Sequence, residues 1–397
     1  MGTAAARKAW LGTLALFLIH GLVVAAWISR IPGVQISLGL SNAALGLSLL
    51  GMALGSVTAI PIAGALINRY GSRRVSTLST YAFCLALNAP GLGWNGFTLF
   101  LGLVVLGATA GTMDVAMNAQ GVLVEKHLHQ SSMSRFHGLF SLGAMIGAMV
   151  GGIVASHHIS VQRHFLIASI VLLVCSIPST GALLDSPEHE SRGHESHRLP
   201  LSKMPRVIWA LSGIAFCVLL SEGAMADWTA VYLRQRFEVG PATAAIGYAV
   251  FSATMAFCRL IGDHVTMRLG NVRTVRNGSL IGAFGLAIAI LAPSVSWAMP
   301  GFAAIGIGFS IIVPLVFGAA GRVRHVSPGA GIATVTGLGY VGFLIGPPLL
   351  GFVSQFVTLR GSLGLVLALC LIAASLAGFL REAQPAPGAW NETSPFV

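Results

Sequence analysis

Residues 138–152 read GLFSLGAMIGAMVGG, and residues 337–351 read GLGYVGFLIGPPLLG. Four glycines of the first stretch return in the second, each 199 residues later, in a chain of 397 residues. The offset is therefore half of the chain. The pairs are Gly138 and Gly337, Gly143 and Gly342, Gly147 and Gly346, and Gly152 and Gly351. Glycine is common here, but four matches at one offset indicate a duplicated fold.

A second place in the sequence keeps the same offset. Arg69-Tyr70-Gly71 returns as Arg268-Leu269-Gly270, with a leucine in place of the tyrosine. The repeat therefore divides the chain into an N-terminal half (1–184) and a C-terminal half (206–381). A polar linker (185–205) joins the halves, and a proline-rich tail (382–397), expected to be disordered and cytoplasmic, follows them.

The composition excludes an ordinary soluble globule. Hydrophobic residues make up 55% of the chain and charged residues 9%, whereas a soluble domain is about 25% charged. Between residues 10 and 380 we distinguish twelve apolar runs of roughly twenty residues, the length of a membrane-spanning helix. The runs do not alternate polar with apolar residues, which excludes an outer-membrane barrel. The sequence predicts an all-α polytopic membrane protein with twelve transmembrane helices in two six-helix parallel pseudo-repeats.

The net charge of +11 indicates topology and not a nucleic-acid partner. Most of the 23 Lys and Arg residues fall in the loops on the side of the termini, as the positive-inside rule requires for cytoplasmic loops. We therefore expect a multi-pass protein of the bacterial cytoplasmic (inner) membrane with both termini in the cytoplasm. The chain has no basic aromatic platform for nucleic acid.

No motif of enzyme chemistry is found in the sequence. It contains no Walker A loop, no G-x-S-x-G elbow and no H-E-x-x-H pair. We therefore expect neither an enzyme nor a transport process driven by ATP hydrolysis. The five cysteines lie in apolar runs without a C-x-x-C, which predicts core packing and no metal or cofactor site. Three linker histidines (His189, His194 and His197) offer metal ligands, but a solvated linker is the preferred interpretation.

Two parallel six-span halves suit alternating access, because each half can rock about a central site. The loop after the second span identifies a family with this design. It reads GALINRYGSRR from Gly64 to Arg74 and resembles the signature G-x-x-x-D-R-x-G-x-R-R of the major facilitator superfamily. The usual aspartate of that signature is replaced by Asn68 in this chain.

The resemblance implies that this loop gates the cytoplasmic side through charge pairing, which Asn68 cannot make. The second half keeps a variant in which Arg259 and Asp263 are spaced to pair on one helix face. A simple cytoplasmic charge anchor is the alternative. The expected gating residues are Gly64, Asn68, Arg69, Gly71, Arg73, Arg74, Arg259, Asp263, Arg268 and Gly270.

Other strings resemble a bacterial subgroup of this superfamily, the MosC/YbjJ-like and sugar-permease-like facilitators. They are WISRIP at 27–32, MDVAMNAQ at 113–120, SRFH at 134–137 and EGAMADW at 222–228. Exporters of the superfamily often carry G-P-x-x-G-G in the fifth span, whereas this chain has GAMVGG at 147–152. These small residues fit an exporter and a plain helix-packing face equally well.

Ionisable residues inside apolar spans are costly, so each is a candidate functional residue. Asp114 and Glu222 are the expected proton carriers, since a carboxyl group shielded from water can bind and release a proton. The expected substrate ligands are His20, Asn118, Gln120, Asp227 and Trp228. The alternatives are a structural hydrogen bond or a pair with a basic residue such as Arg135 for Asp114, an interhelical contact for His20, a solvated surface position for Asp227 and an interfacial position for Trp228.

The sequence thus predicts a secondary active transporter that moves a small polar solute, such as a sugar, polyol or related metabolite, by proton-coupled alternating access. Its expected partners are that solute, protons and the lipid bilayer, and we expect it to act as a monomer. A proton-driven exporter of drugs or metabolites is the alternative. A non-transporting membrane sensor or scaffold is a remote one, because no added signalling domain is found.

Overall fold

The computed structural model of the protein describes residues 3–130, 132–185, 204–324 and 326–382, without the side chains of Thr3, Ala4 and Asp263. Within these ranges the chain is helical. The first half contains α1 (Thr3–Ile28), α2 (Ile31–Ser37), α3 (Asn42–Tyr70), α4 (Ser72–Ala86), the 3-10 turn η1 (Pro90–Leu92), α5 (Gly96–Leu128), α6 (Met133–Ser156) and α7 (Val161–Gly181).

The second half is likewise helical in its described residues. It contains α8 (Arg206–Phe237), α9 (Pro241–Leu269), α10 (Asn271–Leu291), α11 (Val295–Phe309), α12 (Ile312–Ala320), α13 (Pro328–Leu376) and the 3-10 turn η3 (Ala377–Arg381). The backbone of α13 leaves helical geometry at Val357 and Thr358, so this element comprises two helical segments.

The structure confirms the predicted all-α membrane architecture. Ten helices in the described part of the chain are long and apolar enough to cross a membrane. The twelve predicted runs are consistent with these ten: α13 counts once but holds two segments, and α4 is only 15 residues long. Many large apolar side chains on the outside of the bundle are exposed, Leu78 and Phe257 among them, as expected for a surface that faces lipid.

The repeated glycines allow equivalent helices to approach closely. A methyl group added at Gly143 would collide with the Leu18 carbonyl of α1, and one at Gly342 with the Phe216 carbonyl of α8. The contact of α6 on α1 is thus repeated by α13 on α8. Gly143 and Gly342 therefore allow close helix packing in their respective halves.

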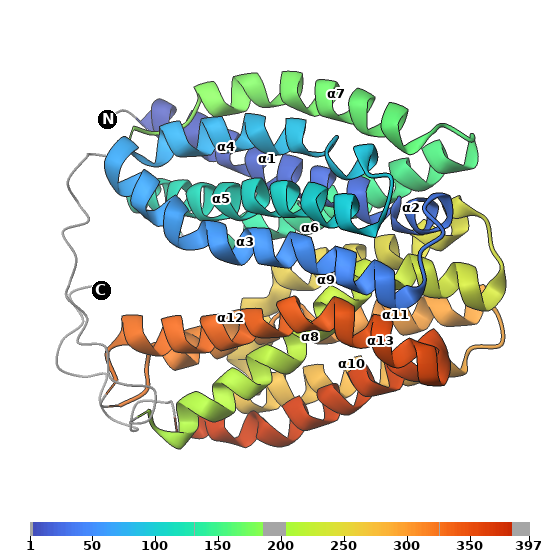
Figure 1. The fold of residues 1–397 in the computed structure, drawn as a ribbon. Coiled ribbons are helices and arrows are strands. Elements are labelled where there is room, and N and C mark those ends of the chain that lie inside the picture. The colour runs from blue at the N-terminus through green and yellow to red at the C-terminus, as the bar shows by residue number, and fades with distance from the viewer. Residues whose placement is uncertain (1–2, 131, 186–203, 325, 383–397) are drawn as a thin grey trace.

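The two halves lie side by side in Figure 1, with α1 to α7 in one bundle and α8 to α13 in the other. Helix α1 begins and η3 ends at the same end of the molecule, which we call the terminal end, and the other end is the distal end. The halves pack through α6 on α9 and α3 on α13.

At the distal end the halves are in direct contact. The side chains of Asn42 in α3 and Gln235 in α8 form two hydrogen bonds, of 2.9 Å and 3.3 Å. A methyl group at Gly46 would lie 2.6 Å from the Pro347 carbonyl oxygen of α13. Toward the terminal end the ribbons of α3 and α13 diverge (Figure 1), and a methyl group at Gly64 or Gly337 would meet nothing within 4 Å. The halves are therefore closed distally.

Candidate functional site

A cavity of about 190 Å³ lies between the two halves. Its wall comes from α1 and α3 of the first half and from α8 and α13 of the second. The wall includes Val24 of α1, Met52 and Ser56 of α3, Gly223 and Asp227 of α8, and Tyr340 and Phe343 of α13. A cavity that takes its wall from both repeats is positioned to open and close as the repeats move against each other.

Of the predicted site residues, Asp227 lines this cavity directly. It is half-buried in the distal part of α8, one helical turn after Gly223. No hydrogen bond or ion pair joins its carboxylate to any residue that the structure describes. The nearby group that interacts with it electrostatically is Tyr248 of α9.

Arg259 of α9 interacts with groups of both halves. The Arg259 guanidinium donates to the Ser141 hydroxyl of α6, in the other half, at 2.9 Å, and to the Ser310 carbonyl at 3.3 Å. It also interacts electrostatically with Glu222 of α8. One Glu222 carboxylate oxygen is buried without a hydrogen bond in the described part of the chain.

The sequence spacing predicts a pair of Arg259 with Asp263 as part of a cytoplasmic gate. This pair stays a prediction, because the Asp263 side chain lies outside the described residues. The structure shows that Arg259 reaches across the interface to α6. The reason is that Ser141 and the Ser310 carbonyl supply acceptors for a charge that would be costly to leave unpaired away from water.

Asp114 and Asn118 are brought together on α5, as their spacing of one helical turn predicts. The Asn118 amide donates to the Asp114 carboxylate at 3.2 Å and to its backbone carbonyl at 2.8 Å. Tyr340 of α13 interacts electrostatically with both Asp114 and Glu222. Its phenol therefore lies near one carboxyl group from each half.

Sequence reasoning missed Tyr340. A signal was available in the repeat, because Tyr340 occupies the position that Ser141 holds 199 residues earlier, three residues after the first repeated glycine. The structure places both at the interface of the halves, where Ser141 accepts from Arg259 and Tyr340 lines the cavity.

Besides Asn118, three other predicted ligands do not line the cavity. The His20 ring is buried between Phe83 of α4 and Phe140 of α6, with ring centroids 5.0 Å and 5.5 Å away. Trp228 is fully buried, and its indole lies against Gly351 of α13. Both side chains therefore pack inside their own half.

Gln120 is the third. Its amide is fully buried near the start of the linker and donates to the Ser72 hydroxyl and the Leu184 carbonyl, both at 2.8 Å. The Leu184 backbone N–H donates in return to the Gln120 carbonyl oxygen at 3.0 Å. These hydrogen bonds occupy the amide, so we leave Gln120 out of the proposed site.

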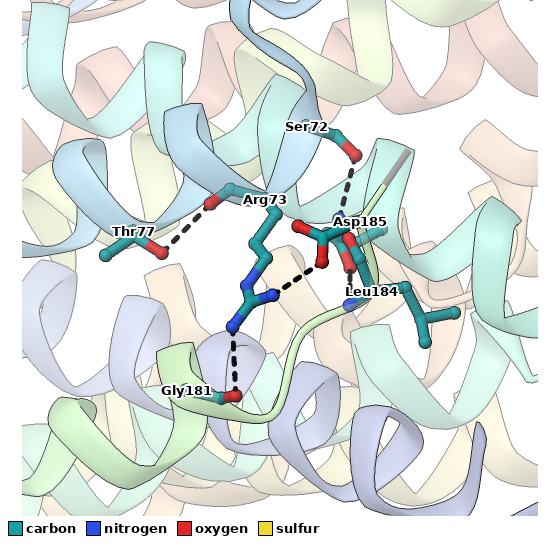
Figure 2. Close-up of polar contacts among 7 residues, drawn as sticks. Ser72, Arg73, Thr77, Gly181, Leu184 and Asp185 are labelled. Atoms are coloured by element: carbon teal, nitrogen blue, oxygen red, sulfur yellow. Dashed lines mark hydrogen bonds and ion pairs between the residues drawn. The ribbon is translucent and has the colours of Figure 1, made fainter. Parts of the chain in front are cut away.

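The predicted gating loops contain two matched turns. Gly71 joins α3 to α4 at φ 82° and ψ 151°, and Gly270 joins α9 to α10 at φ 77° and ψ 156°. Arg73 makes an ion pair of 2.7 Å with Asp185 and donates to the Gly181 carbonyl at 3.4 Å (Figure 2). The loop thus contacts the chain where the linker begins.

The remaining gating candidates face outward. Arg69 stacks over the Tyr70 ring at 5.2 Å, and the side chains of Asn68, Arg74 and Arg268 are exposed. A methyl group added at Gly64 would meet no atom within 4 Å. The linker histidines His189, His194 and His197 lie outside the described residues.

Known proteins resemble this chain over most of its length. An uncharacterised MFS-type transporter of Yersinia pestis is 38% identical over 91% of this chain and 93% of its own. Membrane protein MosC of Rhizobium meliloti is 32% identical over 94% of this chain and 90% of its own. The crystal structure of a bacterial homologue of the human lysosomal transporter Spinster, inward-facing and unoccupied, has the same fold, with a TM-score of 0.72 at 16% identity over 98% of this chain and all of its own.

The sequence model of the Major Facilitator Superfamily matches residues 9–327, which is most of the chain. The match agrees with the loop of residues 64–74, with the repeated glycines and with the two packed halves. The chain therefore belongs to the major facilitator superfamily, among transporters related to MosC.

Proposed function

We propose that this protein is a secondary active transporter that moves a small polar solute across the bacterial inner membrane by proton-coupled alternating access. The observation that carries the proposal is the cavity between the halves, whose wall residue Tyr340 interacts electrostatically with Asp114 of one half and Glu222 of the other. Membership in a transporter family supports the transport step. Sugars, polyols and related metabolites are the solutes that the sequence predicts.

The two carboxyl groups are the proposed proton carriers. Each belongs to a different half, so a change of charge on either one alters the electrostatic balance at the interface where the halves move. Glu222 interacts electrostatically with Arg259, whose guanidinium reaches Ser141 in the opposite half. When Glu222 binds a proton it loses its attraction for Arg259, which then favours the contact with Ser141. Protonation is in this way coupled to the contact between the halves.

The orientation in the membrane is part of the proposal. With both termini in the cytoplasm, as the distribution of Lys and Arg predicts, the distal contact between Asn42 and Gln235 closes the periplasmic side. The structure then corresponds to the state that is closed to the outside. We propose that the monomer is the transporting unit, because the two halves that rock against each other are parts of one chain.

The coupling is tested with Asp114→Asn, which keeps the size of the side chain and removes its charge. A solute is first identified by thermal stabilisation of the purified protein, because a ligand of the folded state raises apparent stability. In proteoliposomes the variant is expected to exchange this solute across the membrane but to lose accumulation driven by a pH gradient. Accumulation at the wild-type level would exclude Asp114 as a carrier, and Glu222→Gln provides the same test for the second site.

Export of drugs or metabolites is a second candidate, and one observation favours it. The cavity wall is mainly apolar, which suits a solute with an apolar body. The direction of transport distinguishes an exporter from a symporter. In everted membrane vesicles an exporter accumulates the solute when the interior is acidified, whereas a symporter releases a preloaded solute under the same gradient.

A further inference from the structure

The cavity offers few polar groups to a bound molecule. Ser56, Asp227 and Tyr340 are the polar side chains of its wall, and the other residues are aliphatic, Met, Gly, Pro or Phe. The Ser56 hydroxyl donates to the Gly107 carbonyl at 2.9 Å, so its hydrogen is already in use. A polyol in this cavity would leave most of its hydroxyl groups without partners, which costs free energy when they leave water.

Asp227 is the feature of the wall that most needs a partner. Its carboxylate forms no hydrogen bond or ion pair within the described residues. The Arg259 guanidinium is directed elsewhere, to the Ser141 hydroxyl and the Ser310 carbonyl. A carboxylate beside an apolar wall is stabilised most by a cation that brings its own apolar body.

Two aromatic rings stand on the same wall. The rings of Tyr340 and Phe343 lie 6.4 Å apart between centroids, at an interplanar angle of 34°. Ring faces attract organic cations, and ammonium groups are recognised by such rings together with a carboxylate. The volume of about 190 Å³ is smaller than the pockets of drug-sized ligands, which measure about 300–1,000 Å³.

From these features we infer that the cavity binds a small organic ammonium ion with an apolar body. Asp227 is the counter-ion of the ammonium group, and Tyr340 and Phe343 contact the cation and its apolar part. The inference rests on the proposed function in one respect, because it takes this cavity as the solute site. Among small polar solutes, it favours small amines over the polyols and sugars that the sequence predicts.

The test uses three probes on the full-length protein purified in detergent. Benzylamine carries the cation at neutral pH, benzyl alcohol is a neutral molecule of the same shape, and sorbitol represents the polyols. Thermal unfolding is followed against the concentration of each probe, which gives an apparent Kd. We expect stabilisation by benzylamine at concentrations at least tenfold lower than for benzyl alcohol, and none by sorbitol. Equal effects of the two benzyl compounds, or a stronger effect of sorbitol, would overturn the inference.

Variants assign the effect to the cavity. Asp227→Asn is expected to weaken benzylamine binding about tenfold or more, because one partner of a shielded charge pair is removed, and to leave benzyl alcohol unchanged. Glu238→Gln makes the same chemical change at the exposed end of α8 and is expected to bind benzylamine as the wild type does. If Asp227→Asn binds benzylamine normally, or if both variants lose it equally, Asp227 is not the counter-ion.

A further variant avoids dependence on the folding of Asp227→Asn. Phe343→Leu retains an apolar side chain and removes a ring, so it is expected to weaken benzylamine binding and to reduce the preference over benzyl alcohol. Binding in detergent requires no proton gradient. If Asp114 and Glu222 prove not to carry protons, the benzylamine binding results would therefore still stand. If benzylamine does not bind, the proposed transport function would still stand, with a different solute.

Discussion

Gln120 and Arg73 both hold the residues at which the linker begins, but they do so in different surroundings. The Gln120 amide is fully buried and forms hydrogen bonds in both directions with Leu184. The ion pair between Arg73 and Asp185 is open to solvent, with the Asp185 side chain 81% exposed (Figure 2). A hydrogen bond lost in a buried place leaves its partner unpaired, whereas an exposed ion pair is replaced by water.

We therefore expect Gln120→Ala to lower the free energy of unfolding by about 1–3 kcal/mol. Asp185→Asn is expected to change it by less than about 1 kcal/mol, with an effect that salt reduces further. Thermal or denaturant unfolding in detergent at low and high salt measures both. A larger loss from Asp185→Asn than from Gln120→Ala would show that the ion pair is the main attachment of the linker.

Single polar residues in apolar runs were the least predictable from sequence. Asp114 and Asn118 could be placed on one face, because a spacing of four residues is one helical turn. His20, Gln120 and Trp228 have equally conspicuous sequence positions, yet their side chains face neighbouring helices of their own half. The direction of a side chain around a helix axis depends on which helices surround it, and a single sequence does not contain that information.

At the level of elements, the repeated helix–turn–helix could be predicted from sequence, because single glycines determine its turns. Gly71 and Gly270 lie in a region of φ and ψ that is adopted almost only by glycine. Each turn reverses the chain within one residue, and the glycine N–H closes the preceding helix on Ile67 or Thr266, both at 2.8 Å. The helix count was harder to predict, because two helical segments meet directly at Val357 and Thr358, where the backbone leaves helical geometry.

The conformation of these turns yields a stability prediction. Gly71→Ala and Gly270→Ala are each expected to lower the free energy of unfolding by about 1–3 kcal/mol, because a Cβ strains the backbone at positive φ. Gly64→Ala is the matched control in the same loop signature, since its Cβ meets open space within α3, and alanine there is expected to be neutral or to stabilise by up to about 1 kcal/mol. Thermal unfolding of the three purified variants is the measurement. Equal losses for all three would refute the strain argument.

For the whole molecule, one pair of helices reports which end is closed. Helices α3 and α13 touch distally, where Gly46 meets the Pro347 carbonyl, and they are apart near the terminal end, where Gly64 and Gly337 have free space around them. If the halves rock about the cavity, the distal contact must open when the terminal contact forms. A large side chain at either contact should therefore shift the equilibrium between the two states, in opposite directions.

We expect Gly46→Leu to favour the distally open state, because leucine does not fit against the Pro347 carbonyl. Gly337→Leu is expected to leave the present state unchanged and to hinder closure of the terminal end. The readout is a cysteine at Ala226, on the cavity wall, in a protein without its native cysteines, labelled with a membrane-impermeant maleimide from each side of oriented vesicles. Labelling from the distal side should rise with Gly46→Leu and fall with Gly337→Leu. A shift in the same direction for both variants would mean that the halves do not move as two rocking bodies, because only a rocking motion makes the two contacts mutually exclusive.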